Sequence, residues 1–143
     1  MGSADAVFID ANALIYFLDE TAAQHNQTVK TLQVLVDAQS DLYTSHHVLE
    51  EVLFIVSRLS NTKDDISLAI QQIAQIPQLE LVEPAADLGF ALSYVKLYKS
   101  SKVGINDTLL LQLMLDAGIR RLFSFDQNFL EQASLLGIQQ VQA

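Results

Sequence analysis

The chain has 143 residues, of which 50% are hydrophobic and 17% are charged, and it contains no cysteine. This composition suits one compact domain with a sizeable core, excludes disulfide bonds and thiolate zinc sites, and fits a protein of the reducing cytoplasm. The formal net charge is −9 at pH 7. Nucleic acid is bound largely through Lys and Arg, so either the partner is not nucleic acid or the negative charge gathers around cations.

No part of the sequence indicates a membrane protein. No uninterrupted apolar run approaches the roughly 18 residues of a membrane span. Residues 1–5 have neither the basic region nor the long apolar segment of a signal peptide. The low charged fraction instead favours an apolar surface that contacts a partner.

The first half of the chain is predicted to alternate between short apolar strands and longer segments with apolar residues at helical spacing. In chain order, these elements are a strand over 6–9, helices over 12–19 and 21–39, a strand over 42–44 and a helix over 46–60. Ser45 is the expected N-cap of the last of these helices. Asn61 and Thr62 open a further helix that ends before Pro77, because a residue that precedes proline disfavours the helical conformation.

The second half continues the same alternation. Its predicted elements are a strand over 79–82, helices over 86–99 and 107–117, and strands over 122–125 and 138–141. Gly118 is the expected end of the second helix. Continuous apolar strands separated by helices predict an α/β fold with a parallel sheet covered on both faces. Such sheets bind ligands beyond the carboxyl ends of their strands, where the strand order reverses.

Four of the 17 acidic residues stand out by their context. Asp10 and Asp126 each follow a predicted strand, so their carboxylates meet if the first and fourth strands are neighbours. Glu51 borders the apolar stripe of its helix, and Asp107 opens another helix. Each position also has an ordinary structural interpretation, namely a helix cap for Asp10 and Asp107, a boundary glutamate for Glu51 and a turn residue for Asp126.

A cluster of these four carboxylates would favour a bound cation. Each close pair would repel by roughly 4 kcal/mol at a moderate effective dielectric. The cluster therefore takes up protons or binds cations. Ligands that are all oxygen favour Mg²⁺ or Mn²⁺ over zinc. Either ion can lower the pKa of a bound water, orient a phosphodiester and offset part of the net charge.

Four segments of the chain resemble the successive motifs of PIN domains, especially of VapC-like toxins. In family order, the segments are VFIDANALIY at 7–16, SHHVLEEV at 45–52, NDTLL at 106–110 and LFSFDQNF at 122–129. Together they span nearly the whole chain. The sequence departs from the family where Thr108 and leucines follow the third acid, a position at which family members often have Ala.

The resemblance implies a single PIN-like domain over 1–143, with a three-layer α/β/α fold and a five-stranded parallel sheet. It implies Mg²⁺- or Mn²⁺-dependent cleavage of RNA, a homodimer and an antitoxin protein that covers the site. On that analogy Asp10, Glu51, Asp107 and Asp126 are the catalytic metal ligands. Asn12 and Ser124 are then polar supports that orient ligands or water.

Basic residues and histidines are further candidates for the site. Lys96, Lys99, Lys102 and Arg58 are candidates for holding RNA phosphates, although a helix C-terminus or a solvated surface explains them as well. His46 and His47 precede Glu50 and Glu51 by four residues, a spacing that can bind zinc, but no third histidine is near. For most of the aromatic residues in apolar elements, core packing is expected rather than base stacking; they are Phe8, Tyr16, Phe17, Phe54, Phe123 and Phe125.

The leading functional hypothesis is an endoribonuclease, the toxin of a toxin–antitoxin pair, acting on structured RNA with exposed loops such as tRNA. One alternative is a non-catalytic interaction module that keeps the fold. Another is a phosphatase acting on small molecules. Haloacid dehalogenase-type phosphatases are disfavoured because Asn12 stands where they need a second Asp, and receiver domains because no Asp follows the third strand.

Overall fold

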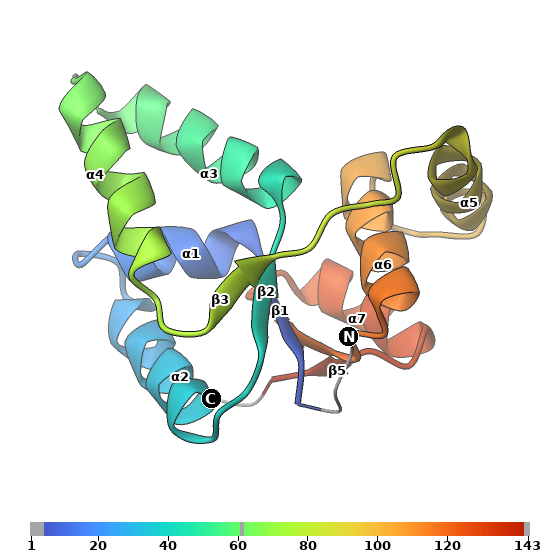
Figure 1. The fold of residues 1–143 in the computed structure, drawn as a ribbon, viewed down its shortest axis with the longest axis horizontal. Coiled ribbons are helices and arrows are strands. Elements are labelled where there is room, and N and C mark those ends of the chain that lie inside the picture. The colour runs from blue at the N-terminus through green and yellow to red at the C-terminus, as the bar shows by residue number, and fades with distance from the viewer. Residues whose placement is uncertain (1–4, 61, 142–143) are drawn as a thin grey trace.

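The computed structural model describes residues 5–60 and 62–141 (Figure 1). Its elements are β1 (Val7–Ile9), α1 (Ala11–Leu18), α2 (His25–Asp37), β2 (Leu42–Thr44), α3 (His46–Leu59), α4 (Lys63–Ala74), β3 (Leu79–Leu81), α5 (Leu88–Tyr98), α6 (Ile105–Ala117), β4 (Arg121–Phe123), α7 (Gln127–Leu135) and β5 (Gln139–Gln140). Asn61 and most of the segment weighed as a signal peptide lie outside the described residues. No helix in the described ranges is long and apolar enough to cross a membrane.

The described strands form one parallel sheet with the order β3-β2-β1-β4-β5. The predicted parallel sheet is therefore confirmed. β1 is the central strand, and Ile9 pairs with Phe123 of β4. The chain runs outward from β1 through β2 to β3 and then returns to β4, so the strand order reverses between β1 and β4. Asp10 and Ser124, which follow these two strands, leave the sheet at the same end.

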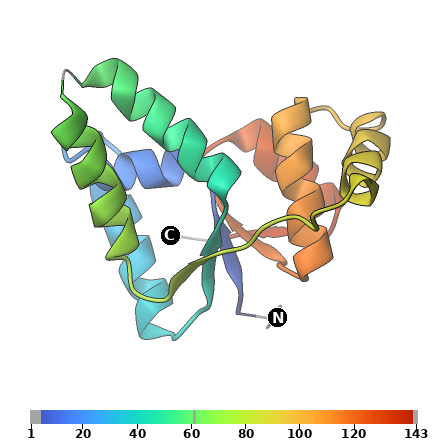
Figure 2. The same ribbon diagram turned by 45° about the horizontal axis from the view of Figure 1, so that its top comes forward.

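Helices cover both faces of this sheet, which confirms the three-layer α/β/α arrangement. Helices α1 to α4 lie on one side and α5 to α7 lie on the other (Figures 1 and 2). This division follows from the handedness of parallel connections. Right-handed crossovers that move outward from β1 place their helices on one face, and crossovers that move the other way from β3 place theirs on the opposite face.

The core lies on both faces of the central strands. All three residues of β1 are fully buried, as are Leu42 and Leu122 on the neighbouring strands. Strands with helices on both faces bury every side chain, which explains why these strands are continuous apolar runs rather than alternating ones. The apolar side of α6 completes this core with Leu110, Leu111, Leu113 and Met114.

The core prediction for the aromatic residues is confirmed for Phe8 and Phe123, which are buried. Phe17 and Phe125 are partly buried against the core. The ring of Tyr16 packs edge-on against that of Phe125, with 5.1 Å between the ring centroids. The prediction was wrong for Phe54, which is 62% exposed. The reason is its place on α3, since Phe54 lies on the helix face opposite the buried Val48 and Val52.

One helix was not predicted, and several boundaries shifted. Helix α7 follows Asp126, whose side chain accepts a hydrogen bond from the backbone N–H of Phe129 at 3.2 Å. Its buried residues Phe129, Leu130 and Ala133 have helical spacing, so the signal was present. Helix α2 begins only at His25, because Asp19 folds the preceding residues into a turn by accepting from both the N–H and the hydroxyl of Thr21.

Candidate active site

Asp10 occupies the carboxyl end of the central strand and is held on both carboxylate oxygens. Its backbone N–H extends the sheet by donating to the carbonyl of Phe123 at 3.0 Å. Its Oδ1 accepts from the N–H of Ala11 at 2.8 Å, which caps α1, and its Oδ2 accepts from the Ser124 hydroxyl at 2.8 Å. The side chain is only 6% exposed. Asp10 therefore has one fixed orientation at the point where the strand order reverses.

Ser124 connects Asp10 to the other polar groups at this end of the sheet. The Asn12 amide donates to the Ser124 hydroxyl at 3.3 Å and accepts from the N–H of Phe125 at 3.0 Å. The N–H of Asp126 also donates to the Ser124 hydroxyl, at 3.1 Å. We call Asp10, Asn12 and Ser124 the strand-end network. The structure thus brings together the two residues that were expected to support the acids.

The structural interpretations weighed for these acids have different outcomes. Asp10 and Asp126 are both helix caps, so capping and a place beside the other acids are compatible at these positions. Asp107 is not a cap, because α6 begins at Ile105 with Gly104 as its N-cap. Asp107 instead lies in the first turn, where the positive end of the helix dipole favours a carboxylate.

Glu51 and Asp107 both line a hollow formed by residues of α3 and α6. These two helices belong to opposite sides of the sheet (Figure 2). We call this the acidic hollow. It has a volume of about 320 Å³ and is lined by His47, Glu50, Glu51, Phe54, Asn106, Asp107 and Leu110. Glu50 and Glu51 are both exposed, although the sequence predicted that Glu51 borders the apolar stripe of its helix. Solvent therefore reaches the acids contributed by α3.

The four predicted acids are electrostatic neighbours. Burial raises the pKa of Asp10 to about 6, against the hydrogen bonds from Ser124 and Ala11, and the charges of Asp107 and Glu51 add to the rise. Burial also raises the pKa of Asp107 to about 6, with further contributions from Asp126 and Glu51 and an opposing one from His47. A cation placed among these acids would relieve both the burial cost and the mutual repulsion.

The chemistry of these donors fits a hard divalent cation, since all four are carboxylates and carboxylate oxygens suit Mg²⁺ and Mn²⁺. Across residues 5–60 and 62–141, no three His, Asp or Glu side chains are arranged as a complete metal-binding group. The strand-end network fixes Asp10, while Glu51 and Asp126 extend from an exposed helix face and an exposed helix cap. The structure therefore supplies the donors as neighbours rather than as a closed coordination shell.

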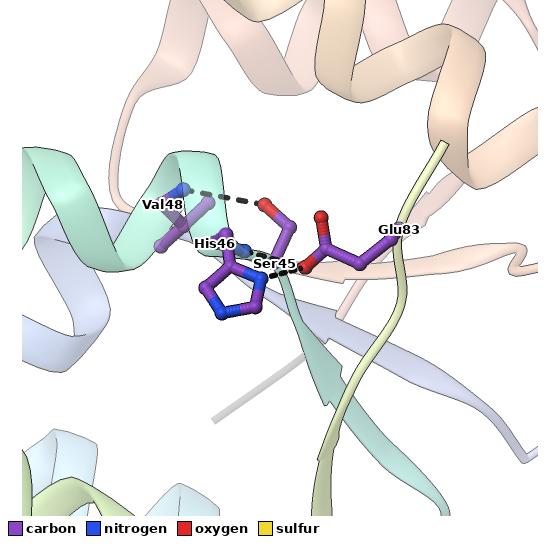
Figure 3. A network of polar contacts seen from close by, with 4 residues as sticks. All are labelled: Ser45, His46, Val48 and Glu83. Carbon is purple, nitrogen blue, oxygen red and sulfur yellow. Dashed lines mark hydrogen bonds and ion pairs between the residues drawn. The ribbon is translucent and has the colours of Figure 1, made fainter. Parts of the chain in front are cut away.

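The two adjacent histidines have different environments. Figure 3 shows His46 directed at Glu83, which follows β3; the backbone N–H and the ring Nδ1 of His46 both lie 2.8 Å from Glu83 Oε1. Ser45 caps the same helix end by accepting from the N–H of Val48 at 3.2 Å. His47 instead lines the acidic hollow. Glu83 therefore occupies the ring Nδ1 of His46, one of the two histidines whose spacing to a glutamate can bind zinc.

The three candidate lysines lie at and just after the end of α5, whereas Arg58 lies on α3. Lys96 lies in the last turn of α5, Lys99 is its C-cap, and the backbone N–H of Lys102 donates to Gln132 at 3.1 Å. None of these three lysines lines the acidic hollow as the described residues define it. Arg58 lies closer to the acidic hollow, because its guanidinium lies over the ring of Phe54, 5.3 Å from the ring centroid, and Phe54 lines the hollow.

Sequence reasoning did not place Phe54, Asn106 or Glu50 at the site. The motif that contains Asn106 assigns it no role, and the sequence singles out Glu50 only through its four-residue spacing from His46. The available signal was helical spacing, since positions three and four apart on α3 share a face with Glu51. That spacing becomes informative only when α6 is known to lie opposite.

Solved structures share this fold at low sequence identity. VapC20 of Mycobacterium tuberculosis, described as a Sarcin-Ricin loop cleaving toxin, matches with a TM-score of 0.66 and 21% identity over 96% of this chain and 99% of that one. VapBC2 of Rickettsia felis, solved bound to a DNA fragment from its promoter, matches with a TM-score of 0.71 and 17% identity, covering 94% and 96%. FitAcB of Neisseria gonorrhoeae matches with a TM-score of 0.63 and 14% identity, covering 95% and 96%.

Sequence comparison identifies the family to which the chain belongs. Ribonuclease VapC1 of Aquifex aeolicus (strain VF5) is 24% identical over 129 residues, which cover 89% of this chain and 85% of that protein. The family model for the PIN domain matches residues 7–135. That range contains all four motifs from which the resemblance was stated, from Asp10 to Asp126. The chain therefore belongs to the PIN domain family.

Proposed function

We propose that this protein is a Mg²⁺- or Mn²⁺-dependent endoribonuclease and the toxin of a type II toxin–antitoxin pair. The observation that carries the proposal is the environment of Asp10. This carboxylate is buried, fixed by Ser124 and Ala11, and close enough to Asp107 and Glu51 for their charges to raise its pKa. The relation to a protein named ribonuclease VapC1 supports the same activity.

In this proposal Asp10, Glu51, Asp107 and Asp126 hold the cation. When bound, it would acidify a water molecule and neutralise charge on the phosphodiester. The chain's own contribution is orientation. Ser124 and the N–H of Ala11 fix Asp10, and the helix cap at Asp126 fixes the backbone from which its carboxylate extends. Hydrolysis forms a bond from water oxygen to phosphorus and breaks the bond to the leaving ribose oxygen, which takes a proton.

The proposed substrate is a structured RNA with an exposed loop, such as tRNA. Bases in loops are unpaired and accessible, whereas side chains cannot read the deep groove of an RNA helix. One structural relative is described as cleaving the Sarcin-Ricin loop. Lys96, Lys99, Lys102 and Arg58 are proposed to hold phosphates.

The proposed partners are a cognate antitoxin and a second copy of the chain. Structural relatives were solved as VapBC2 and as FitAB, the latter bound to an IR36 DNA fragment. We expect the protein to act in the cytoplasm, where its RNA substrates are. Co-purification with the product of the adjacent upstream gene, and binding of promoter DNA only by the mixture, would test the antitoxin.

The decisive experiment is cleavage of total RNA and tRNA by the purified protein with and without Mn²⁺. We expect cleavage with Mn²⁺, none in excess EDTA, and roughly a thousandfold less cleavage by Asp10→Asn. Asp116→Asn is the matched control, because Asp116 is an exposed acid near the far end of α6. Cleavage that persists in EDTA would refute the mechanism. Hydrolysis of a phosphomonoester without RNA cleavage would instead identify a phosphatase. A protein that is inactive and whose melting temperature does not change with Mn²⁺ would be an interaction module.

A further inference from the structure

An exposed aromatic ring lies at the edge of the acidic hollow. Phe54 is 62% exposed, although α3 buries Val48 and Val52 completely on its other face. A phenyl ring left in water forgoes a substantial part of the roughly 1.5–3 kcal/mol that burying it would contribute. The ring lies one helical turn beyond Glu51 and lines the same hollow as Asp107. It is therefore held open to solvent beside two of the proposed metal ligands.

Arg58 lies one turn further along the same face of α3. Its guanidinium lies over the Phe54 ring, 5.3 Å from the ring centroid. This planar cation adds positive charge next to the acidic hollow. Aromatic rings and arginine planes are the groups on which proteins stack unpaired RNA bases, and this stacking tolerates any base because every base has a flat face.

The rest of the hollow suits the edge of a base. Asn106 supplies amide donors and an acceptor, and His47 supplies a ring N–H in either of its tautomers. The carboxylate of Glu50, on the same wall, would repel a phosphate but can accept hydrogen bonds from a base. The volume of about 320 Å³ provides room for one planar ring system rather than a folded RNA segment.

We propose that Phe54 and Arg58 form a base-stacking subsite that holds one unpaired RNA base beside the acidic hollow. This inference rests on the proposed function, since it presumes RNA as the substrate. In the subsite, Phe54 and Arg58 position the strand so that an adjacent phosphodiester lies against Asp10, Glu51, Asp107 and Asp126. Both are positioning residues, and neither contacts the reacting atoms.

A protein partner is the competing explanation for an exposed phenylalanine, but the neighbours of Phe54 argue against it. Leu110 is the other apolar side chain in the described lining of the acidic hollow, and the remaining members are polar or charged. A more apolar hollow lies between α3 and α4, lined by Ile55, Val56 and Leu68. A partner that buries apolar surface has a better site there.

The test measures RNA binding in EDTA, so that it does not depend on cleavage. The probe is a short single-stranded RNA that carries 2-aminopurine, a base whose fluorescence is quenched by stacking. We expect Phe54→Ala to weaken binding about tenfold and to abolish the quenching. Phe54→Trp should keep both. Leu135→Ala is the matched control, because Leu135 is 74% exposed on α7 and lies outside the hollow.

The outcomes separate this proposal from the proposed function. Equal RNA affinity and equal quenching for Phe54→Ala and the unchanged protein would overturn the subsite, even if Mn²⁺-dependent cleavage is intact. A Phe54→Ala variant that alters only the oligomeric state, measured by sedimentation, would assign the ring to a protein contact and also overturn it. Quenching that depends on Phe54 without any cleavage would support the subsite and refute the nuclease.

Discussion

The strand-end network and the acidic hollow are neighbouring regions with opposite construction. In the strand-end network, Asp10 and Ser124 are buried and hydrogen-bonded, and no buried side-chain polar atom in the described residues lacks a partner. In the acidic hollow, Glu50, Glu51 and Asn106 are exposed. The difference teaches that the fold makes one carboxylate rigid and leaves others free to adjust. Under the proposed function, the site accepts both a cation and a polymer, and it needs both properties.

The largest expected effect on RNA cleavage comes from replacing one carboxylate of each region by the corresponding amide. Asp10→Asn should reduce Mn²⁺-dependent RNA cleavage by roughly a thousandfold, because the fixed acid cannot be replaced by a mobile neighbour. Glu51→Gln should cost less, about ten- to a hundredfold, because solvent and the other acids can compensate. Single-turnover rates, with circular dichroism to verify folding, measure both losses. Equal losses would remove the proposed distinction between a rigid and an adjustable acid.

The second effect concerns stability and pH. Burial raises the pKa of Asp10 to about 6 from 3.8, so the folded protein binds this proton more tightly than the unfolded chain. The folded state is therefore favoured at low pH and loses stability as pH rises from about 4 to about 6, by roughly 3 kcal/mol for this group. In EDTA, Asp10→Asn should gain stability relative to the unchanged protein over that range.

Chemical denaturation at pH 4.5, 6 and 7.5 provides the measurement for this second effect. Addition of Mn²⁺ at pH 7.5 should restore stability to the unchanged protein and not to Asp10→Asn, because the cation replaces the missing proton. A difference between the two proteins that stays constant with pH would show that burial does not perturb Asp10.

A smaller effect is expected within the strand-end network. Ser124→Ala removes the hydroxyl that donates to Asp10 and accepts from the N–H of Asp126. Loss of such a supporting group typically lowers metal affinity or activity about 10- to 100-fold. The Mn²⁺ concentration needed for half-maximal cleavage should therefore rise. Ser124→Thr, which keeps the hydroxyl, is the control, and an unchanged Mn²⁺ requirement in Ser124→Ala would contradict the supporting role.

The smallest effect is expected at the start of α3. Glu83→Ala removes the acceptor of two hydrogen bonds from His46, but both side chains are largely exposed. Exposed pairs of this kind contribute about 1 kcal/mol or less. We expect a slightly lower melting temperature and unchanged cleavage. A loss of cleavage comparable to that of Ser124→Ala would mean that this link positions Glu51.

Much of the fold could be predicted because the central strands are buried on both faces. Uninterrupted apolar runs such as Val7–Ile9, followed by helical spacing, indicate a parallel sheet with few alternatives. The approach of Asp10 and Asp126 was predicted on the condition that the first and fourth strands are neighbours, and the pairing of β1 with β4 confirms that condition. Ser45 acted as the expected cap. These features depend on local pattern and on general rules of topology.

The remaining features depend on tertiary packing. Helix α3 has apolar residues at most positions from Val48 to Val56, so periodicity alone does not say that Phe54 is the one turned outward. Helix α7 was missed because Gln127 and Asn128 continue a turn-like polar segment after Asp126. Whether Lys96 or Arg58 approaches the site is set by which helices lie opposite one another, and no spacing in the chain encodes that directly.

The position of β1 in the sheet has a consequence for translation. β1 is made first, but one of its two neighbours is β4 at Arg121–Phe123, and Ser124 and Asp126 come later still. A nascent chain that has not yet released these residues from the ribosome lacks half of the strand pairing around Asp10. Under the proposed function, an unfinished or prematurely terminated toxin would be harmless to the cell that makes it.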